Sequence, residues 1–275
     1  MANITASDVN KLRQMTGAGM MDCKNALVEN GGDFDKAIDF LRKKGQKLAA
    51  KRADRDANEG MVIAQTSADG KYASVLMISS ETDFVAKNEE FVNFCKTASD
   101  LATKNMIKSM EAVLAMDVEG RSLGERITDL VGKIGEKIEL THFEFIEGPK
   151  VFAYNHNGNR LASIVAFDKV TSDEVGANVA MQIAAMSPVS IDENSVAKEV
   201  IEHELTLARE IIRQEGKPEN MVEKIAQGKL NKFFKDNTLL HQEYIKDGKL
   251  SVGQYITNHG EGAKVIAFRR LMLGA

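Results

Sequence analysis

Two segments of similar pattern, about ninety residues apart, constrain the fold of this chain more than any other feature. Residues 61–80 (MVIAQTSADGKYASVLMISS) contain two β-rich runs around an Asp-Gly pair, and residues 150–167 (KVFAYNHNGNRLASIVAF) contain two around an Asn-Gly pair. Such pairs between apolar runs are strong signals of a β-hairpin. Because hairpins join these strands, we predict an α+β fold with antiparallel sheets in two related subdomains, and a further strand at 137–148 between them.

A helical pattern follows each hairpin. The second is NVAMQIAAM at 178–186, and the first begins at Asn88, whose side chain can cap the first turn of a helix with apolar residues on one face. Phe84 lies outside that face, in the polar joint ETDFVAKN (81–88) between strand and helix. Two interpretations stay open. Phe84 caps the subdomain core from the loop, or it is an exposed aromatic anchor of the kind that dominates interfaces.

The first fifty residues predict a compact module of three helices. Thr5 and Asp8 fit a capping box, the turn TGAG at 16–19 ends the first helix, and a second helix covers roughly 20–29. Asp33 can cap a third helix, which we expect to end before Gly45. Three short helices make only a small core, so we interpret this module as a docking piece followed by a charged linker.

The adjacent residues Met20 and Met21 lie near the start of the second helix. Two neighbouring side chains cannot both face inward on a short helix, and methionine suits adaptable partner surfaces. Exposure of one of them and core packing of both remain alternatives.

A further helical hairpin interrupts the second subdomain. Apolar residues recur at four-and-three spacing from Ser195 to Arg213, and a turn with Gly216 and Pro218 leads to a return helix. Its apolar seam is too narrow for a core, so we predict two antiparallel helices. The predicted boundaries are a docking module at 1–53, a linker at 54–60, a first core subdomain at 61–148, a second at 149–190 and 235–275, and the inserted hairpin, a coiled coil, at 191–234.

Composition argues against several classes of protein. A length of 275 residues with 43% hydrophobic and 28% charged residues is typical of a soluble protein with more than one module. A net charge of −4 disfavours a broad nucleic-acid-binding surface. Cys23 and Cys95 lie outside any CxxC motif, so we expect a reducing cytoplasm rather than a disulfide framework. No stretch reaches the roughly 18 apolar residues of a membrane span, and we expect no membrane association.

No motif assembles a catalytic or metal site. The segment TGAGMMDCK (16–24) has the glycines of a phosphate-binding loop, but no strand precedes it and its spacing matches neither common form. The five histidines form no HExxH or other close ligand pair. Serine and cysteine lack the context of a nucleophile. We therefore expect a protein that is not an enzyme and binds no metal or cofactor.

Three segments together resemble the elongation factor Ts family, and the resemblance runs in order over essentially the whole chain. They are VNKLRQMTGAGMMDCKNAL (9–27), ETDFVAKN (81–88) and GKLNKFFKDNTLLHQEYIKD (228–247). The resemblance implies an N-terminal three-helix module of the UBA-like kind, a core of two related α+β subdomains and an inserted coiled-coil hairpin. It also implies a function, namely guanine nucleotide exchange on the GTPase elongation factor Tu in protein synthesis.

The resemblance further implies which residues contact elongation factor Tu. The family's TDFV segment, which enters the GTPase domain and perturbs its magnesium site, maps onto four residues: Thr82, Asp83, Phe84 and Val85. The N-terminal helices would contact the nucleotide-binding domain through Leu12, Arg13, Met20 and Met21. His156 matches a further family contact, on a hairpin whose sequence differs. The resemblance leaves open a homodimer or a heterotetramer with elongation factor Tu, and implies no direct contact with nucleic acid.

Two other classes of protein fit part of the pattern. A nucleotide-binding enzyme would need a phosphate loop, which the sequence lacks. A coiled-coil scaffold would explain residues 195–233 but would leave two subdomains and an aromatic residue in a polar joint without a purpose.

Overall fold

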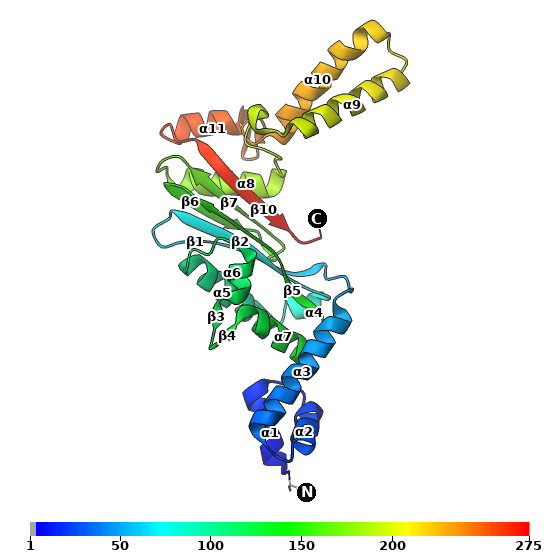
Figure 1. The fold of residues 1–275 in the computed structure, drawn as a ribbon. Coiled ribbons are helices and arrows are strands. Elements are labelled where there is room, and N and C mark those ends of the chain that lie inside the picture. Colours follow the sequence, from blue (N-terminus) through cyan, green and yellow to red (C-terminus); the bar gives the residue numbers. More distant parts are fainter. Residues whose placement is uncertain (1–3, 275) are drawn as a thin grey trace.

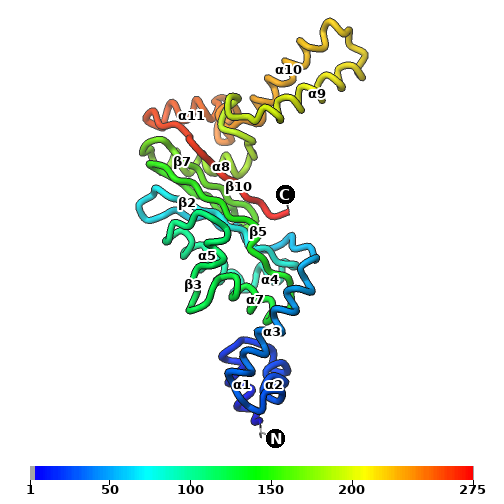
Figure 2. Tube along the Cα trace, in the orientation of Figure 1, coloured from blue at the N-terminus to red at the C-terminus, as the bar shows by residue number. Residues whose placement is uncertain are grey.

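The computed structural model describes residues 4–274 of the chain and is elongated (Figure 1). Two antiparallel three-stranded sheets form its middle, three helices lie at the N-terminal end, and a pair of long helices projects from the opposite end (Figures 1 and 2). In the part of the chain that is described, no helix is long and apolar enough to cross a membrane.

The first sheet has the strand order β1-β2-β5 and the second has the order β6-β7-β10. The strands of the first are β1 (Glu59–Thr66), β2 (Tyr72–Ser80) and β5 (Ile138–Glu147). Between β2 and β5 lie α4 (Asp83–Ala86), α5 (Glu89–Lys104), α6 (Met110–Ala115), the short strands β3 (Asp117–Val118) and β4 (Arg121–Ser122), and α7 (Leu123–Ile134).

The second sheet repeats this arrangement with a different insertion. Its strands are β6 (Lys150–Asn155), β7 (Leu161–Phe167) and β10 (Val265–Met272). Between β7 and β10 lie α8 (Asp173–Met186), the 3-10 turn η1 (Glu193–Ser195), α9 (Lys198–Gln214), α10 (Glu219–Asn237), β8 (Glu243–Tyr244), β9 (Asp247–Ser251) and α11 (Val252–His259). Each half is thus a hairpin, a helix, an insertion, a helix and a third strand. The predicted repeat, its antiparallel pairing and the strand at 137–148 are confirmed.

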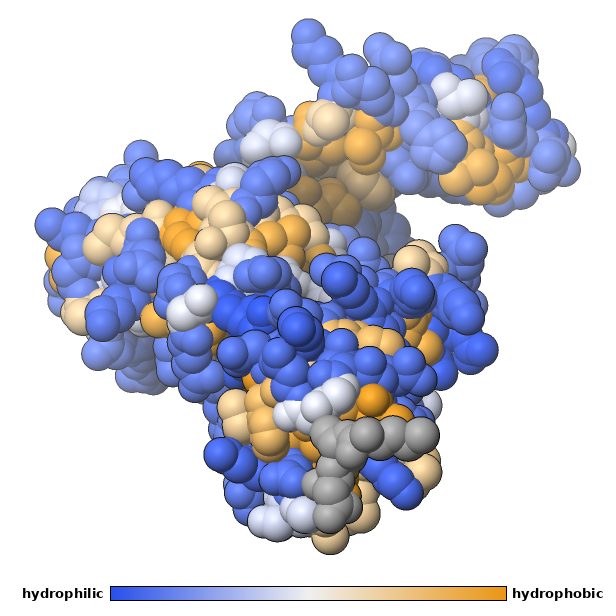
Figure 3. Space-filling view, turned by 60° about the horizontal axis from the view of Figure 1, so that its bottom comes forward, coloured by the Kyte–Doolittle hydropathy of each residue, from blue (hydrophilic) through white to orange (hydrophobic). Residues whose placement is uncertain are grey.

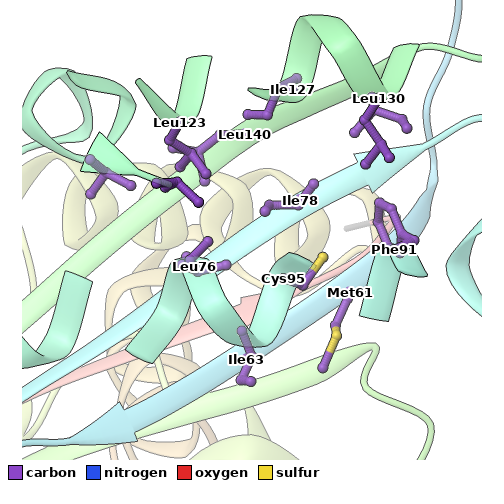
Figure 4. Close-up of a cluster of buried hydrophobic side chains, with 14 of the residues drawn as sticks. Met61, Ile63, Leu76, Ile78, Phe91, Cys95, Leu123, Ile127, Leu130 and Leu140 are labelled. Carbon is purple, nitrogen blue, oxygen red and sulfur yellow. The ribbon is translucent and has the colours of Figure 1, made fainter. Parts of the chain in front are cut away.

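The two sheets pack face to face, and helices cover their outer faces. Strand β2 is buried at all nine positions because sheet residues cover one side and helices cover the other. Figure 4 shows the outer cluster of the first half, in which Phe91 and Cys95 from α5 and Leu130 from α7 point toward Leu76 and Ile78 of β2. Asn88 accepts hydrogen bonds from the backbone N–H groups of Glu90 and Phe91, as its predicted capping role requires.

The N-terminal helices are α1 (Ala6–Thr16), α2 (Met20–Glu29) and α3 (Phe34–Arg52). The capping box of Thr5 and Asp8 is present, and Gly17 ends α1 with a left-handed backbone. The expected end of the third helix before Gly45 is wrong, because α3 continues to Arg52. Gly45 is buried where α3 crosses α7 beside Gly132, and a Cβ atom at either position would press on the other helix. The helix is therefore extended by packing against the first half.

The second half differs from its prediction at the start of α8 and at the end of the inserted hairpin, where α10 continues to Asn237 instead of ending by residue 234. Helix α8 begins at Asp173 instead of Asn178, because the Ser172 side chain accepts a hydrogen bond from Val175 N–H, and Gly176 leaves room for the ring of Phe152. Helices α9 and α10 form a hairpin and bury a narrow apolar seam between them (Figure 1). The seam residues are Ala208, Ile212, Val222 and Ala226, with Leu205 and Ile225 packed at its margin.

Candidate functional site

The TDFV segment forms the one-turn helix α4, between β2 and α5. Thr82 is its N-cap, with an extended backbone and a hydroxyl that accepts a 3.5 Å hydrogen bond from Val85 N–H. Asp83 lies in the first turn and makes a 2.7 Å ion pair with Lys87, four residues later. This hydrogen bond and the positive charge of Lys87 hold the pKa of the Asp83 carboxyl below its usual value. Local residues thus specify a single helical turn at the end of a buried strand.

Phe84 projects from this turn into solvent, with 83% of its surface exposed. The interpretation that it caps the subdomain core is therefore wrong. Most of the large aromatic side chains in the same half are buried or partly buried, and Phe91, only seven residues later, is fully buried. Leaving an aromatic side chain in water forgoes about 1.5–3 kcal/mol of burial. Because aromatic side chains dominate the binding energy of many interfaces, we treat this turn as a candidate contact surface.

Val85, the next residue, has the opposite environment. It is only 7% exposed and packs in the cluster formed by β1, β2, α5 and α7. Its side chain is therefore not available as a direct contact in this structure. We reassign Val85 to an anchoring role, in which it inserts into the core on one side of the turn while Phe84 points away on the other.

A second anchor comes from the turn between α7 and β5. The half-buried carboxylate of Glu136 accepts hydrogen bonds from the Thr82 backbone N–H at 3.1 Å and from the Thr82 hydroxyl at 2.9 Å. Gly135 precedes Glu136 and ends α7 with a left-handed backbone. The end of α7 therefore fixes where the carboxylate lies, and we call the Glu136–Thr82 contact the clasp.

Glu81, the residue before Thr82, connects the same region to α3. Its carboxylate accepts hydrogen bonds from Lys137 N–H and from the Arg52 guanidinium, both at 2.6 Å, and Arg55 lies 3.5 Å away. Burial disfavours the charged carboxylate, but these hydrogen bonds and the two arginine charges outweigh it and lower the pKa of Glu81. The Lys137 ammonium also donates to the carbonyl of Ala53 at 2.7 Å. The end of α3, the start of α4 and the start of β5 are thus held together, as their adjacency in Figure 1 shows.

The N-terminal helices present a separate apolar surface. Met15, Met20 and Met21 flank the α1–α2 turn and are 57%, 56% and 64% exposed. Core packing of both Met20 and Met21 is therefore excluded. Figure 3, in which this end of the molecule comes forward, shows apolar side chains gathered there among polar ones. Arg13 is exposed in the last turn of α1.

Leu12 requires a correction. It is fully buried in the small core that α1, α2 and α3 share, together with Val9, Cys23 and Leu27. Because its neighbours cover it completely, we reassign Leu12 from a contact residue to a core residue that supports the exposed surface.

His156 lies in the β6–β7 turn and is exposed. Its Nδ1 atom is 3.0 Å from the hydroxyl of Tyr154. The turn itself is fixed to the first sheet, because the Asn159 carbonyl accepts a 2.7 Å hydrogen bond from Val62 N–H. His156 thus projects from a well-held turn, and its contact with a partner stays a prediction.

A cleft of about 900 Å³ separates the N-terminal helices from α5 and α7. Its cationic side chains have acidic partners: Arg42 with Asp39, Lys44 with Asp22, Arg121 with Asp129, Arg126 with Glu119, and Lys133 with Glu90. Each of the cleft's described cations thus has a carboxylate partner, which disfavours a phosphate site there. Within residues 4–274 there is also no cluster of three metal-ligating side chains.

The residues around the clasp were missed by reasoning from sequence. Ser122 and Glu125 form a capping box that signals α7, and Gly135 signals its end, so the helix could have been found. The hydrogen bond between Glu136 and Thr82 spans 54 positions and leaves no local pattern.

Comparison with known proteins identifies the family of this chain. The family model described as "Elongation factor TS" matches residues 81–275. The protein named elongation factor Ts from Christiangramia forsetii is 50% identical to this chain over the full length of both. The protein of the same name from Amoebophilus asiaticus is 49% identical to it over 99% of both chains. The protein of that name in Flavobacterium psychrophilum is 48% identical over the full length of both chains. The TDFV turn, with its exposed phenylalanine, lies within the matched region. The chain belongs to the elongation factor Ts family.

Proposed function

We propose that this chain is a guanine nucleotide exchange factor, which binds elongation factor Tu in its GDP-bound form and promotes release of the GDP. Its family supports this function. The observation in the structure that carries it is Phe84, an aromatic side chain 83% exposed on a helical turn that Thr82 and Val85 anchor. In this proposal the chain makes and breaks no covalent bond, so it is not an enzyme.

The proposed mechanism is the insertion of Phe84 beside the magnesium site of the GTPase. Magnesium demands near-ideal octahedral geometry and helps to hold the nucleotide phosphates. A wedge that shifts the surrounding elements by a fraction of a metal–ligand distance weakens that coordination. Exchange factor and nucleotide then bind with negative coupling, and each weakens the other by the same factor. Each 1.4 kcal/mol of coupling corresponds to about tenfold in affinity.

In this proposal the chain contacts elongation factor Tu through two surfaces. The exposed methionines of the N-terminal helices, with Arg13, dock on the nucleotide-binding domain, and the turn at 82–85 acts on the metal site. Met20 and Met21 support this division because adaptable apolar side chains suit a docking surface. The ion pair between Arg52, at the end of α3, and Glu81 would help to keep the two surfaces in one orientation.

Release of a fluorescent GDP analogue from elongation factor Tu tests the function. The chain at micromolar concentration should accelerate release when unlabelled GDP is in excess, and a chain with Phe84→Ala should accelerate it about ten- to a hundredfold less. Equal release with and without the unmodified chain would refute the function. Equal activity of the variant and the unmodified chain would refute the wedge alone.

Calorimetry gives an independent control. The isolated chain should bind neither GDP nor GTP, because it has no phosphate-binding loop. Micromolar binding of GDP to the chain without its partner would favour a nucleotide-binding protein instead.

A further inference from the structure

The one-turn helix α4 cannot hold itself in place. A single helical turn fixes several backbone torsions for very few hydrogen bonds and is unfavourable in isolation. Phe84 adds no stabilising packing, since it lies in solvent, and the Asp83–Lys87 ion pair is exposed. The turn is therefore held by its inward contacts. These are the burial of Val85, the clasp of Glu136 on Thr82, and a 3.1 Å hydrogen bond that the buried Ser80 hydroxyl donates to the Thr82 carbonyl.

Val85 and the clasp restrain different motions of the turn. Val85 fills an apolar site, which is non-directional and tolerates rotation of the turn. The clasp is directional, because one carboxylate accepts from both the backbone N–H and the hydroxyl of the N-cap residue. Hydrogen bonds to a charged group are stronger than neutral ones. The Ser80 hydrogen bond joins two neutral groups, so the clasp is the strongest directional contact on the turn and the main one that sets where Phe84 points.

Resting on the proposed function, we propose that Glu136 is a positioning residue for exchange: its clasp on Thr82 holds the turn so that Phe84 points outward before a partner arrives. Phe84 is then preorganised, and the partner does not have to order the turn when it binds. Without this preorganisation, part of the binding free energy would be spent on ordering the turn, and less would remain to distort the metal site. Glu136 itself touches no nucleotide or metal in this scheme and acts through Phe84.

The same turn ties Phe84 to the N-terminal helices. Glu136 and Lys137 are neighbours, and Lys137 donates through its backbone to Glu81 and through its ammonium to Ala53 at the end of α3. A pull on α3 by a docked partner would therefore act on the segment that holds Thr82. Within this proposal, docking by the N-terminal helices and the orientation of Phe84 are mechanically linked.

The first experiment measures stimulated GDP release as a function of chain concentration. The variant Glu136→Ala should lower the maximal release rate about tenfold, since it removes two charge-assisted hydrogen bonds, with a smaller change in the concentration for half-maximal effect. Glu136→Gln keeps an oxygen acceptor and should recover most of the loss. The matched control is Glu147→Gln, which alters an exposed glutamate of β5 that pairs with Lys108, and it should release GDP at the unmodified rate.

Combination with Phe84→Ala decides whether Glu136 acts through Phe84. If it does, the double variant should be no slower than Phe84→Ala alone, within about twofold, because the aromatic group to be positioned is already absent. A double variant that is slower by a further tenfold would overturn the inference. So would an unmodified rate for Glu136→Ala. An inactive unmodified chain would instead show that the proposed function fails.

A second readout needs no partner. The chain has no tryptophan, so Phe84→Trp introduces a single tryptophan on the turn, which can be excited selectively over the four tyrosines. Time-resolved anisotropy should show a fast component whose amplitude grows about twofold when Glu136→Ala is added, and stays unchanged when Glu147→Gln is added. Urea melts would verify that each variant is folded. Equal anisotropy decay with and without Glu136 in folded chains would overturn the claim that the clasp orders the turn.

Discussion

After β2 the chain builds the one-turn helix α4 before α5 begins, whereas after β7 it passes through residues 168–172 directly into α8. These two joints occupy equivalent places in the repeat. They share one contact, which we call the clip. The residue that follows the second strand is acidic, and its carboxylate accepts a hydrogen bond from the backbone N–H of the residue that precedes the third strand. The pairs are Glu81 with Lys137 at 2.6 Å, and Asp168 with Lys264 at 2.8 Å.

The joints differ at the next position. Thr82 is held by Glu136, whereas the corresponding residues of the second half are Lys169 and Ala263, which cannot form such a contact. The second joint also exposes an apolar residue, Val170, at 69%, but it builds no helical turn around it. A contact found in both halves belongs to the fold. The clasp and the turn with Phe84 occur in one half only, and this is where we place the function.

The largest expected effect comes from reversing the polarity of Phe84. Phe84→Asp should slow stimulated GDP release by about a hundredfold or more, because a carboxylate must be desolvated where the aromatic ring would bind. The unfolding free energy should change by no more than about 0.5 kcal/mol, as for other surface substitutions. Stopped-flow release and urea melts on one preparation measure both quantities. A strongly destabilised variant would indicate that Phe84 packs in the core.

A smaller effect is expected at the N-terminal helices. Changing Met20→Gln together with Met21→Gln should weaken binding to elongation factor Tu about tenfold, since two exposed apolar contacts are lost. The maximal release rate at saturation should stay unchanged, in contrast to the change at Phe84. Titration calorimetry measures the affinity, and release curves measure the maximal rate. A lower maximal rate with unchanged affinity would show that these methionines belong to the metal-site surface.

Asp83→Ala should have a smaller effect on exchange than the changes at Phe84 or at Met20 and Met21. A hydrogen bond at a wet interface contributes about 1 kcal/mol net, so release should slow about fivefold. Lys87→Ala removes the intramolecular partner of Asp83 and serves as the comparison. If both variants slow release equally, the ion pair within the turn matters more than a contact of Asp83 with the partner protein.

The smallest effect concerns the clip that both halves share. Asp168→Asn should lower the unfolding free energy by about 0.5–1 kcal/mol, because an exposed hydrogen-bonded carboxylate contributes little, and should leave GDP release unchanged. Glu81→Gln should cost more stability, since its carboxylate is less exposed and also binds Arg52. A loss of exchange activity in Asp168→Asn would contradict the assignment of the clip to the fold.

Local signals in the sequence predicted much of the fold. The capping residues Thr5 and Asn88 and the hairpin turns at 69–70 and 157–158 all lie where short-range chemistry specifies structure. The prediction failed for α3, where packing of Gly45 on α7 overrides a residue that usually ends helices.

The candidate site was predictable in part, and the limit is physical. The TDFV motif drew attention to this segment, but the sequence left open whether Phe84 faces the core or the solvent, and the resemblance placed the buried Val85 among the contacts. That choice depends on how a one-turn helix is held. The carboxylate that holds it, Glu136, lies 54 positions away in sequence and is brought to Thr82 only by the packing of α7 and β5.

The central claim is that the exposed aromatic residue of the first joint serves exchange, while the exposed apolar residue of the second does not. Paired measurements on Phe84→Ala and Val170→Ala test it most directly, by urea melts for stability and stopped-flow release of fluorescent GDP from elongation factor Tu for exchange. Both variants should retain their unfolding free energy within about 0.5 kcal/mol. Only Phe84→Ala should slow release, by about ten- to a hundredfold. Equal release by the two variants, or a Phe84→Ala chain that is destabilised by about 3–5 kcal/mol yet exchanges normally, would contradict the account.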